Sequence, residues 1–135
     1  MIPHSLKNNL QFLVPHAWNN THVLVSTKRP LKVYKKIIYY DKKDMERPRI
    51  IQLTIPKNAL IVMPRHYNYK YFWLHKCRTN KAISHGQGFS SYNDNFKYEI
   101  NKTMKPEKPF SRSLTTCESG IHFFFSKTQA KKYIF

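Results

Sequence analysis

Two cysteines and two histidines are the side chains of this sequence best suited to hold a metal ion. They are His75, Cys77, Cys117 and His122. Two thiolates and two imidazoles can form a tetrahedral zinc site, but the spacings His-x-Cys and Cys-x4-His differ from those of zinc knuckles. The same residues are compatible with two buried thiols and a hydrogen-bonded core histidine, which we favour for His122, or with a Cys77–Cys117 disulfide. We therefore predict no metal and no cofactor, with these four residues as the candidates if a metal binds.

Catalysis by a nucleophilic cysteine would need a neighbouring base, and His75 or His122 could supply it. The chain has seven histidines, so a histidine near each cysteine is expected by chance. Gly86 and Gly88 are not followed by the helix and Lys-Ser/Thr pair of a phosphate-binding loop. With only seven acidic residues, a catalytic pair of carboxylates is implausible. We predict that the protein is not an enzyme.

Positive charge dominates the composition. The sequence has 24 Lys and Arg against 7 Asp and Glu, a formal net charge of +17. Such a charge attracts nucleic acid, an anionic membrane or an acidic protein, although an AT-rich coding sequence would also supply many solvated lysines. We predict that the contact with DNA, RNA or an acidic partner is made by Lys28, Arg29, Lys32, Lys35, Lys36, Lys42, Lys43, Arg47 and Arg49.

An aromatic segment supplies the candidate protein interface. Tyr67, Tyr69, Tyr71 and Trp73 alternate with other residues, so in a strand they would share one face. They could stack on nucleic-acid bases, but exposed aromatic groups of this extent more often contact another protein.

Elements that would position these side chains follow from the hydrophobic pattern. It predicts strands over residues 22–26, 31–41, 50–55, 59–63, 96–100 and 121–125. Residues 41–49 are predicted to be an exposed loop that ends at Pro48. Gly120 is expected to take a positive φ where a turn enters the last strand. The capping box Ser126-x-x-Gln129 predicts a helix that runs through Tyr133.

The strand over residues 31–41 has two distinct faces. One carries Leu31, Val33, Lys35, Ile37 and Tyr39, and the other interleaves lysines with tyrosines. The second face resembles that of single-strand nucleic-acid binders. It is also compatible with an ordinary sheet face whose tyrosines pack while its lysines keep their charged ends in water, and we favour this second interpretation.

A chain of 135 residues is long enough for one domain. We predict an α+β fold: a small, mainly antiparallel β domain over residues 22–135 with a short C-terminal helix, preceded by an irregular N-terminal arm, residues 1–21. No segment approaches the roughly 18 apolar residues of a membrane span. Residues 1–14 also do not form a secretion signal.

Several short motifs occur in a fixed order over residues 50–133. They are a strand ending at Ile55-Pro56, Lys76-Cys77-Arg78, the stretch from Phe96 to Lys102, Cys117-x-x-Gly120-Ile121-His122-Phe123-Phe124, and a helix with Ala130 and Tyr133. In this order they resemble an uncharacterised domain of large DNA viruses and phages that typically follows pentapeptide repeats. No such repeats precede it here. The resemblance implies a viral protein, in the virion or in the cytoplasm of an infected cell, with other viral structural proteins as partners.

The segment from Gly120 to Phe123 also resembles, with the helix after it, the closing strand of poly-ADP-ribosyltransferases. His85-Gly86 would then stand for the His-Gly motif of that fold. The fold requires a later glutamate, and no acidic residue follows Glu118. This second resemblance therefore implies at most a degenerate ADP-ribosyltransferase-like domain. We predict a basic, non-enzymatic structural or interaction protein of the virion that contacts acidic protein surfaces, and the alternative is a nucleic-acid-binding protein that coats or condenses a viral genome.

Overall fold

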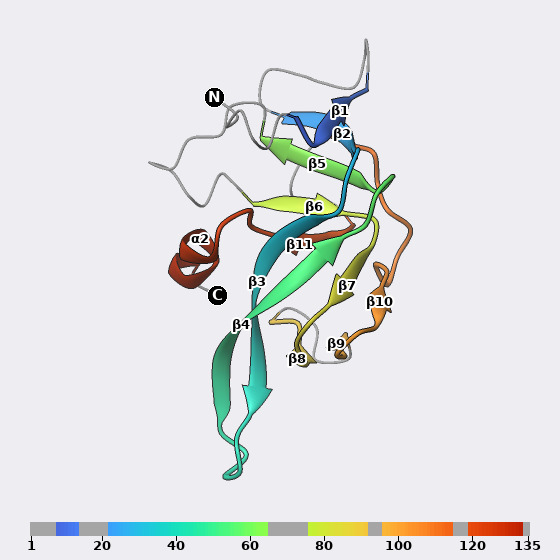
Figure 1. Cartoon of the computed structure of the whole chain (residues 1–135). Coiled ribbons are helices and arrows are strands. Elements are labelled where there is room, and N and C mark those ends of the chain that lie inside the picture. The colour runs from blue at the N-terminus through green and yellow to red at the C-terminus, as the bar shows by residue number, and fades with distance from the viewer. Residues whose placement is uncertain (1–7, 14–21, 65–75, 92–95, 115–118, 134–135) are drawn as a thin grey trace.

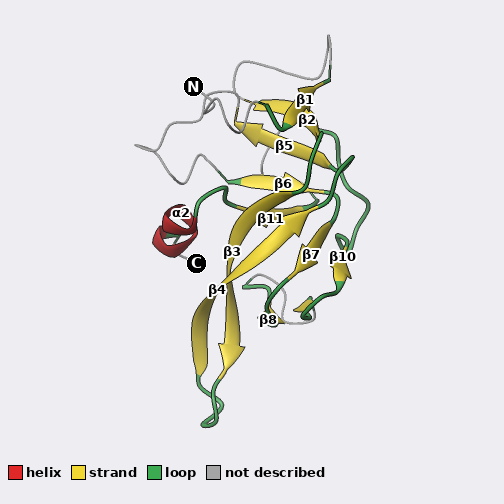
Figure 2. Ribbon diagram, in the orientation of Figure 1, coloured by secondary structure: helices red, strands yellow, loops and turns green. Residues whose placement is uncertain are grey.

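The computed structural model describes residues 8–13, 22–64, 76–91, 96–114 and 119–133. Within them the chain forms two antiparallel sheets and one short helix (Figures 1 and 2). The first sheet has the order β1-β2-β5-β6-β11, with strands Leu10–Phe12, His22–Thr27, Leu60–Pro64, Cys77–Thr79 and Ile121–Phe123. The second has the order β10-β7-β4-β3-β8-β9, with strands Thr103–Met104, Ala82–Ser84, Glu46–Ile55, Leu31–Tyr40, Gly88–Phe89 and Lys97–Tyr98. Helix α2 spans Lys127–Lys132.

The predicted class is confirmed in its main features, which are mainly antiparallel sheets and a short C-terminal helix. Residues 10–12 of the predicted arm pair with β2 as β1, and Leu10 is buried in the core. The predicted strand over residues 96–100 is present only as the two residues of β9. No helix among the described residues is long and apolar enough to cross a membrane.

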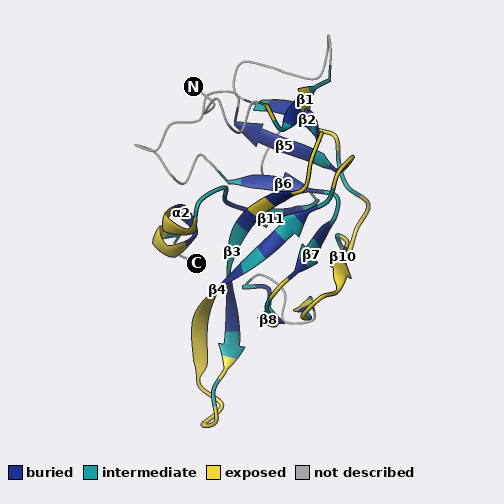
Figure 3. Cartoon of the chain, in the orientation of Figure 1, coloured by how far each residue is buried: buried dark blue, intermediate teal, exposed yellow. Residues whose placement is uncertain are grey.

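The core lies where the inward-facing residues of the two sheets meet (Figure 3). Val23, Val25 and Ile61 contribute from the first sheet, and Val33 and Leu53 contribute from the second. Alternation along each strand sends every second side chain inward. The apolar residues Leu31, Val33 and Ile37 on the recognised face of β3 are buried in this way.

Strand β3 joins the two sheets. The main-chain N and O atoms of Tyr34 each lie 2.8 Å from the O and N atoms of Phe124, the residue just after β11. Farther along the same strand, Ile38 pairs with Phe89 of β8. Two different segments thus pair with β3 at positions four residues apart.

Strands β3 and β4 form a long hairpin whose far end projects beyond the rest of the molecule (Figure 1). The prediction of a loop over residues 41–49 is wrong for residues 46–49, which belong to β4. Pro48 lies opposite Ile38 in the ladder. The main-chain N–H and C=O groups of Tyr34 bond to Phe124, on the edge of β3 opposite β4. The direction of these groups repeats at every second residue, so those of Ile38 also point away from β4. The ladder therefore requires no N–H from Pro48, and a proline is tolerated there.

The C-terminal helix begins as predicted. Ser126 is its N-cap, and the Ser126 hydroxyl accepts a hydrogen bond of 3.1 Å from the main-chain N–H of Gln129. Gln129 and Ala130 are buried on the side of the helix that packs against β3 and β4. The helix ends at Tyr133, which is its C-cap.

Candidate functional site

Three lysines from two parts of the chain line one small pocket. Lys35 and Lys36 come from β3, and Lys76 directly precedes β6. The other lining residues are Ser91, His122, Phe124 and Tyr133. The enclosed space is about 10 Å³, room for a single water molecule, and none of the residues named as its lining is acidic. We call these seven residues the lysine pocket.

The pairing of β3 explains where the lysine pocket lies. Phe124 pairs with Tyr34 and Phe89 pairs with Ile38, so the edge of β3 is flanked by two segments with Lys36 midway between them. His122 and Phe124 line the pocket from one flank, and Ser91 lines it from the other. The pocket therefore lies beside β3, between β11 with Phe124 on one side and the residue Ser91, which follows β8, on the other.

Lys35 occupies an inward-facing position between Val33 and Ile37, both fully buried. Its Nζ atom donates a hydrogen bond of 2.7 Å to the main-chain oxygen of His122 and lies 5.9 Å from the centre of the Tyr98 ring. Burial lowers the pKa of Lys35 to about 7, and the nearby charge of Lys76 lowers it in the same direction. The charge of Lys35 is therefore sensitive to its surroundings near neutral pH.

Tyr133 connects the other two lysines. The ammonium group of Lys36 donates to the main-chain oxygen of Tyr133 at 2.7 Å. Lys76 donates to the Tyr133 hydroxyl at 3.0 Å and lies 4.8 Å from the ring centre. The Tyr133 ring also packs against Phe124, with ring centres 5.4 Å apart. Tyr133, the C-cap of helix α2, thus lines the pocket and contacts two of its lysines.

Arg78, two residues after Lys76, is a fully buried arginine. Its guanidinium donates hydrogen bonds to the main-chain oxygens of Ser111, Ser113 and Ser119, and it lies 5.0 Å from the ring centre of Phe110. A planar group with five donors suits such a cluster of carbonyls. Arg78 therefore fixes the irregular segment before β11 to strand β6.

The reason for a glycine at position 120 differs from the one expected. Gly120 is not among the residues with positive φ, so the expected left-handed conformation is wrong. A Cβ atom at Gly120 would lie 2.9 Å from the Cβ of Arg78 and 3.3 Å from its Cγ and Cδ atoms. Glycine is needed because the arginine side chain passes directly against the main chain.

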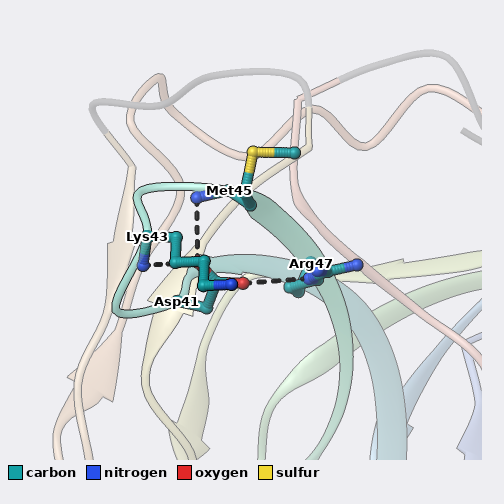
Figure 4. Close-up of polar contacts among 4 residues, drawn as sticks. All are labelled: Asp41, Lys43, Met45 and Arg47. Carbon is teal, nitrogen blue, oxygen red and sulfur yellow. Dashed lines mark hydrogen bonds and ion pairs between the residues drawn. The ribbon is translucent and has the colours of Figure 1, made fainter.

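The second candidate surface is the far end of the β3–β4 hairpin, residues 39–49, which we call the projecting hairpin. Asp41 organises its turn (Figure 4). One carboxylate oxygen of Asp41 accepts hydrogen bonds of 2.9 Å from the N–H groups of Lys43 and Met45, and the other accepts from Nε of Arg47 at 3.1 Å. These bonds, that of Met45 first and that of Arg47 next, lower the pKa of Asp41. The turn is thus ordered by its own side chains.

The base of the projecting hairpin is also braced. The Arg49 guanidinium lies 4.0 Å from the centre of the Tyr39 ring and donates to the main-chain oxygen of Gln87 at 3.1 Å. Residues 42–49 are all exposed, and the apolar side chains of Tyr40 and Met45 are 43% and 54% exposed. The result is an ordered projection with accessible apolar side chains.

The nine basic residues predicted to contact an anionic partner fall into three groups. Lys28, Arg29 and Lys32 are exposed at the start of β3. Lys35 and Lys36 line the lysine pocket. Lys42, Lys43, Arg47 and Arg49 belong to the projecting hairpin. Arg49 lies opposite Ile37, about 17 Å along β3 from Lys32 at a rise of about 3.3 Å per residue, and Lys42 and Lys43 lie farther away in the turn.

The remaining candidates are placed only in part. Tyr67, Tyr69, Tyr71 and Trp73 lie outside the described residues, as do His75 and Cys117. Cys77 is fully buried, and burial raises the pKa of its thiol well above the usual value. Among the described residues no three His, Cys, Asp or Glu side chains gather in a way that could hold a metal. The expectation that His122 is a core residue is wrong, since it is half-buried and lines the lysine pocket.

Sequence reasoning missed Lys76 and Tyr133 as site residues. They are 57 positions apart, so no local spacing joins them. One signal was present for Lys35, which occupies an inward position of a strand whose neighbours on that face are apolar. A lysine is rarely buried unless it has a partner, so such a position indicates either a site or a structural contact.

Comparison with known proteins finds a similar protein in a giant virus. "Uncharacterized protein L223" of Acanthamoeba polyphaga mimivirus is 32% identical over 98 residues, which cover 62% of this chain and 61% of that protein. The chain thus matches less than two thirds of that relative's length. No solved structure matches. A family of unknown function, DUF5758, matches residues 21–130, which confirms the resemblance to an uncharacterised domain with a giant-virus relative. The chain therefore belongs to this family of unknown function, DUF5758.

Proposed function

We propose that this protein is a non-enzymatic interaction protein of a large DNA virus whose projecting hairpin docks onto an acidic protein surface. The observation that carries the proposal is the hairpin itself. It projects beyond the rest of the molecule, its turn is held by Asp41, and the contact of Arg49 with Gln87 braces its base. An ordered projection needs little further ordering when it binds, which favours affinity.

The charge of the projecting hairpin favours a protein over a phosphate backbone. Residues 41–49 contain four basic and three acidic side chains, so their net charge is only +1. Such a surface contrasts with a continuous row of cations, which nucleic acid would favour. Tyr40 and Met45 offer apolar contact area, and aromatic residues and methionine are enriched at protein interfaces. The overall charge of +17 would steer the chain toward an acidic partner.

The finer role we propose is that of a minor capsid or core assembly component that binds other viral structural proteins. The relative from mimivirus supports the viral context, and the high positive charge suits assembly with acidic proteins. The absence of enzymatic activity and the association of the family with pentapeptide repeats remain part of this proposal.

A second candidate function is nucleic-acid binding. The exposed residues Lys28, Arg29 and Lys32 favour it, because residues 28–32 include three basic and no acidic side chains. Titration of random-sequence DNA or RNA binding against salt tests it, since a phosphate-contacting protein loses affinity linearly in a log–log plot. Replacement of the three residues by Gln should lower the slope by about 3 if they contact phosphates.

Cross-linking mass spectrometry tests the first proposal. An amine-reactive cross-linker applied to purified virions and to infected-cell fractions should join Lys42 or Lys43 to one acidic viral protein. Lys131 and Lys132 are equally exposed on helix α2 and serve as the internal control. If the hairpin lysines cross-link no more selectively than these two, the docking proposal is wrong.

A further inference from the structure

We propose that three chain connections at one end of the molecule form a single surface that binds the phosphodiester backbone of DNA or RNA. The inference rests on the second candidate function, nucleic-acid binding, and identifies its site. The cations in or beside these connections, which we call the loop-end surface, are Lys28, Arg29, Lys32, Lys57 and Lys81. Lys57 and Lys81 are not among the nine basic residues predicted from the sequence, because they lie far from the others along the chain.

Thr27 joins the first two connections. This residue is buried at the end of β2, and its hydroxyl donates a hydrogen bond of 2.6 Å to the main-chain oxygen of Pro56. The main-chain oxygen of Thr27 accepts from the N–H of Asn58 at 2.9 Å. Lys28 directly follows Thr27, and Lys57 lies between Pro56 and Asn58. The connection from β2 to β3 and the connection from β4 to β5 therefore place these two cations close together.

Asn80 joins the third connection, from β6 to β7, to the second. Its side-chain oxygen accepts a hydrogen bond of 2.9 Å from the N–H of Leu60, and its own N–H donates to the Leu60 oxygen at 3.2 Å. Leu60 begins β5, directly after the connection that contains Lys57, and Lys81 directly follows Asn80. Lys81 is thus held beside the same group of connections.

Lys32 lies near the other four cations, at the start of β3. It is opposite Thr54 of β4, and Thr54 is opposite Ile83 of β7, two residues after Lys81. With about 4.8 Å between paired strands, Lys32 and Ile83 are about 10 Å apart. The three connections lie together on the right of Figure 1, away from the projecting hairpin. The five cations therefore share one end of the molecule.

The charge of the loop-end surface favours a polyanion. Residues 22–36, 50–60 and 76–85, which contain all five cations, include no acidic residue. All five are exposed except Lys81, which is half-buried. Neither of the two ion pairs found within the described part of the chain involves any of them. Cations of this kind can neutralise successive phosphates, and the release of counter-ions then drives binding.

The lack of apolar side chains in this set favours nucleic acid over an acidic protein. The large apolar side chains that are exposed among the described residues are Tyr40, Met45 and Ile100, and none of them belongs to the three connections. A protein interface usually has an apolar centre within a polar rim. Contacts to phosphates need only positive charge and hydrogen-bond donors, which the loop-end surface supplies. It therefore differs in kind from the projecting hairpin, where charges of both signs surround apolar side chains.

Salt titration of binding to random-sequence duplex DNA tests the inference with two charge-matched double variants. Lys57→Gln with Lys81→Gln removes two charges from the loop-end surface. Lys42→Gln with Lys43→Gln removes two charges from the projecting hairpin, where both lysines are exposed. We expect the first double variant to lower the log–log slope by about 2 and the affinity at about 0.1 M salt at least about tenfold. The second should change the slope by less than about 0.5.

The outcomes separate this site from nucleic-acid binding in general. Equal changes of slope in both double variants would overturn the loop-end site and leave nucleic-acid binding in place. Absence of binding by the unaltered protein even at low salt would overturn both. If the loop-end variant instead loses affinity for an acidic viral protein while its DNA binding is unchanged, the surface belongs to a protein partner and the proposal is wrong. The same titration with random-sequence RNA distinguishes the two sources of the backbone, because the natural ligand should bind more tightly at equal salt.

A second measurement uses the unaltered chain, so it holds even if a variant fails to fold. Acetylation of lysines by acetic anhydride is followed by mass spectrometry, with and without DNA. Bound DNA should slow the acetylation of Lys57 and Lys81, whereas Lys42 and Lys43 should react at the same rate in both cases. Equal protection of the two pairs would show that DNA binds through overall charge alone, which would contradict the proposal.

Discussion

The Nζ atom of Lys35 lies 2.7 Å from the main-chain oxygen of His122, so an inward-facing lysine links β3 to β11. This contact lies beside the Tyr34–Phe124 bridge, which joins the two sheets. The position gives Lys35 two properties: it takes part in the junction of the sheets, and it carries its titratable group into a partly enclosed gap.

The stability of the fold should depend on pH through Lys35. Its pKa is about 7 in the folded chain and 10.5 when exposed, so between these values the unfolded chain binds a proton that the folded chain does not. The free energy of unfolding therefore rises with pH in this window. We expect a gain of about 1–2 kcal/mol between pH 7 and pH 9, lower than the full linkage value because the side chain is only half-buried.

Urea unfolding at both pH values checks this. Lys35→Met should remove most of the gain, whereas Lys32→Met, an exposed change on the same strand, should retain it. An equal gain in both variants would show that another group causes the pH dependence.

Arg78→Met should destabilise the protein by about 3 kcal/mol or more. The substitution removes a fully buried guanidinium and leaves the main-chain carbonyl groups of Ser111, Ser113 and Ser119 without the donors that bind them. Chemical denaturation measures the loss, and Arg112→Met, at an exposed arginine, is the matched control. A loss below about 1 kcal/mol would mean that water replaces the guanidinium without penalty.

Gly120→Ala should cost about 1–3 kcal/mol, because the added Cβ meets the side chain of Arg78. The same contact predicts a coupling between the two sites. In a double-mutant cycle with Arg78→Met, the cost of Gly120→Ala should fall only in part, because the outer atoms of the methionine can move aside but its Cβ stays 2.9 Å from the added Cβ. A cost of Gly120→Ala that is smaller than about 0.5 kcal/mol in the unaltered background would indicate that this close contact is relieved by a small shift of the main chain.

Asp41→Ala should disorder the turn of the projecting hairpin while the sheets stay folded. The two N–H groups of Lys43 and Met45 lose their acceptor, and Arg47 loses its ion pair. We expect faster amide hydrogen exchange at Lys43 and Met45. Asp41→Asn retains one acceptor oxygen and should preserve much of the protection at these two amides. Unchanged exchange in the alanine variant would show that the turn is held by the ladder alone.

Much of the fold follows from local rules that the sequence displays. Alternation of apolar residues identified β3, and the capping box identified the start of α2. The extension of β4 through Pro48 was not recognisable, because it depends on which edge of β3 faces Phe124. From the sequence alone, a proline indicates the end of a strand. Only the position of the partner strand shows whether the ladder needs an N–H group at that residue.

The candidate sites were less predictable for a similar reason. Lys36 and Tyr133 meet across 97 positions and Lys76 and Tyr133 across 57, so only the folded chain brings them together. Arginine is usually found at the surface, but Arg78 is fully buried. Its guanidinium is bound there by three main-chain carbonyl groups of an irregular segment. Side-chain type alone did not distinguish this arginine from those of the projecting hairpin.

The most direct test of the docking proposal is the affinity of two serine variants for the viral protein cross-linked to Lys42 or Lys43. Met45→Ser changes the projecting hairpin, and Ile100→Ser changes a side chain of equal exposure, 54%, elsewhere in the chain. Docking through the hairpin predicts that Met45→Ser weakens binding at least about tenfold while Ile100→Ser leaves it within about twofold. Equal affinity of both variants and the unaltered protein would contradict the proposal that this hairpin is the docking element.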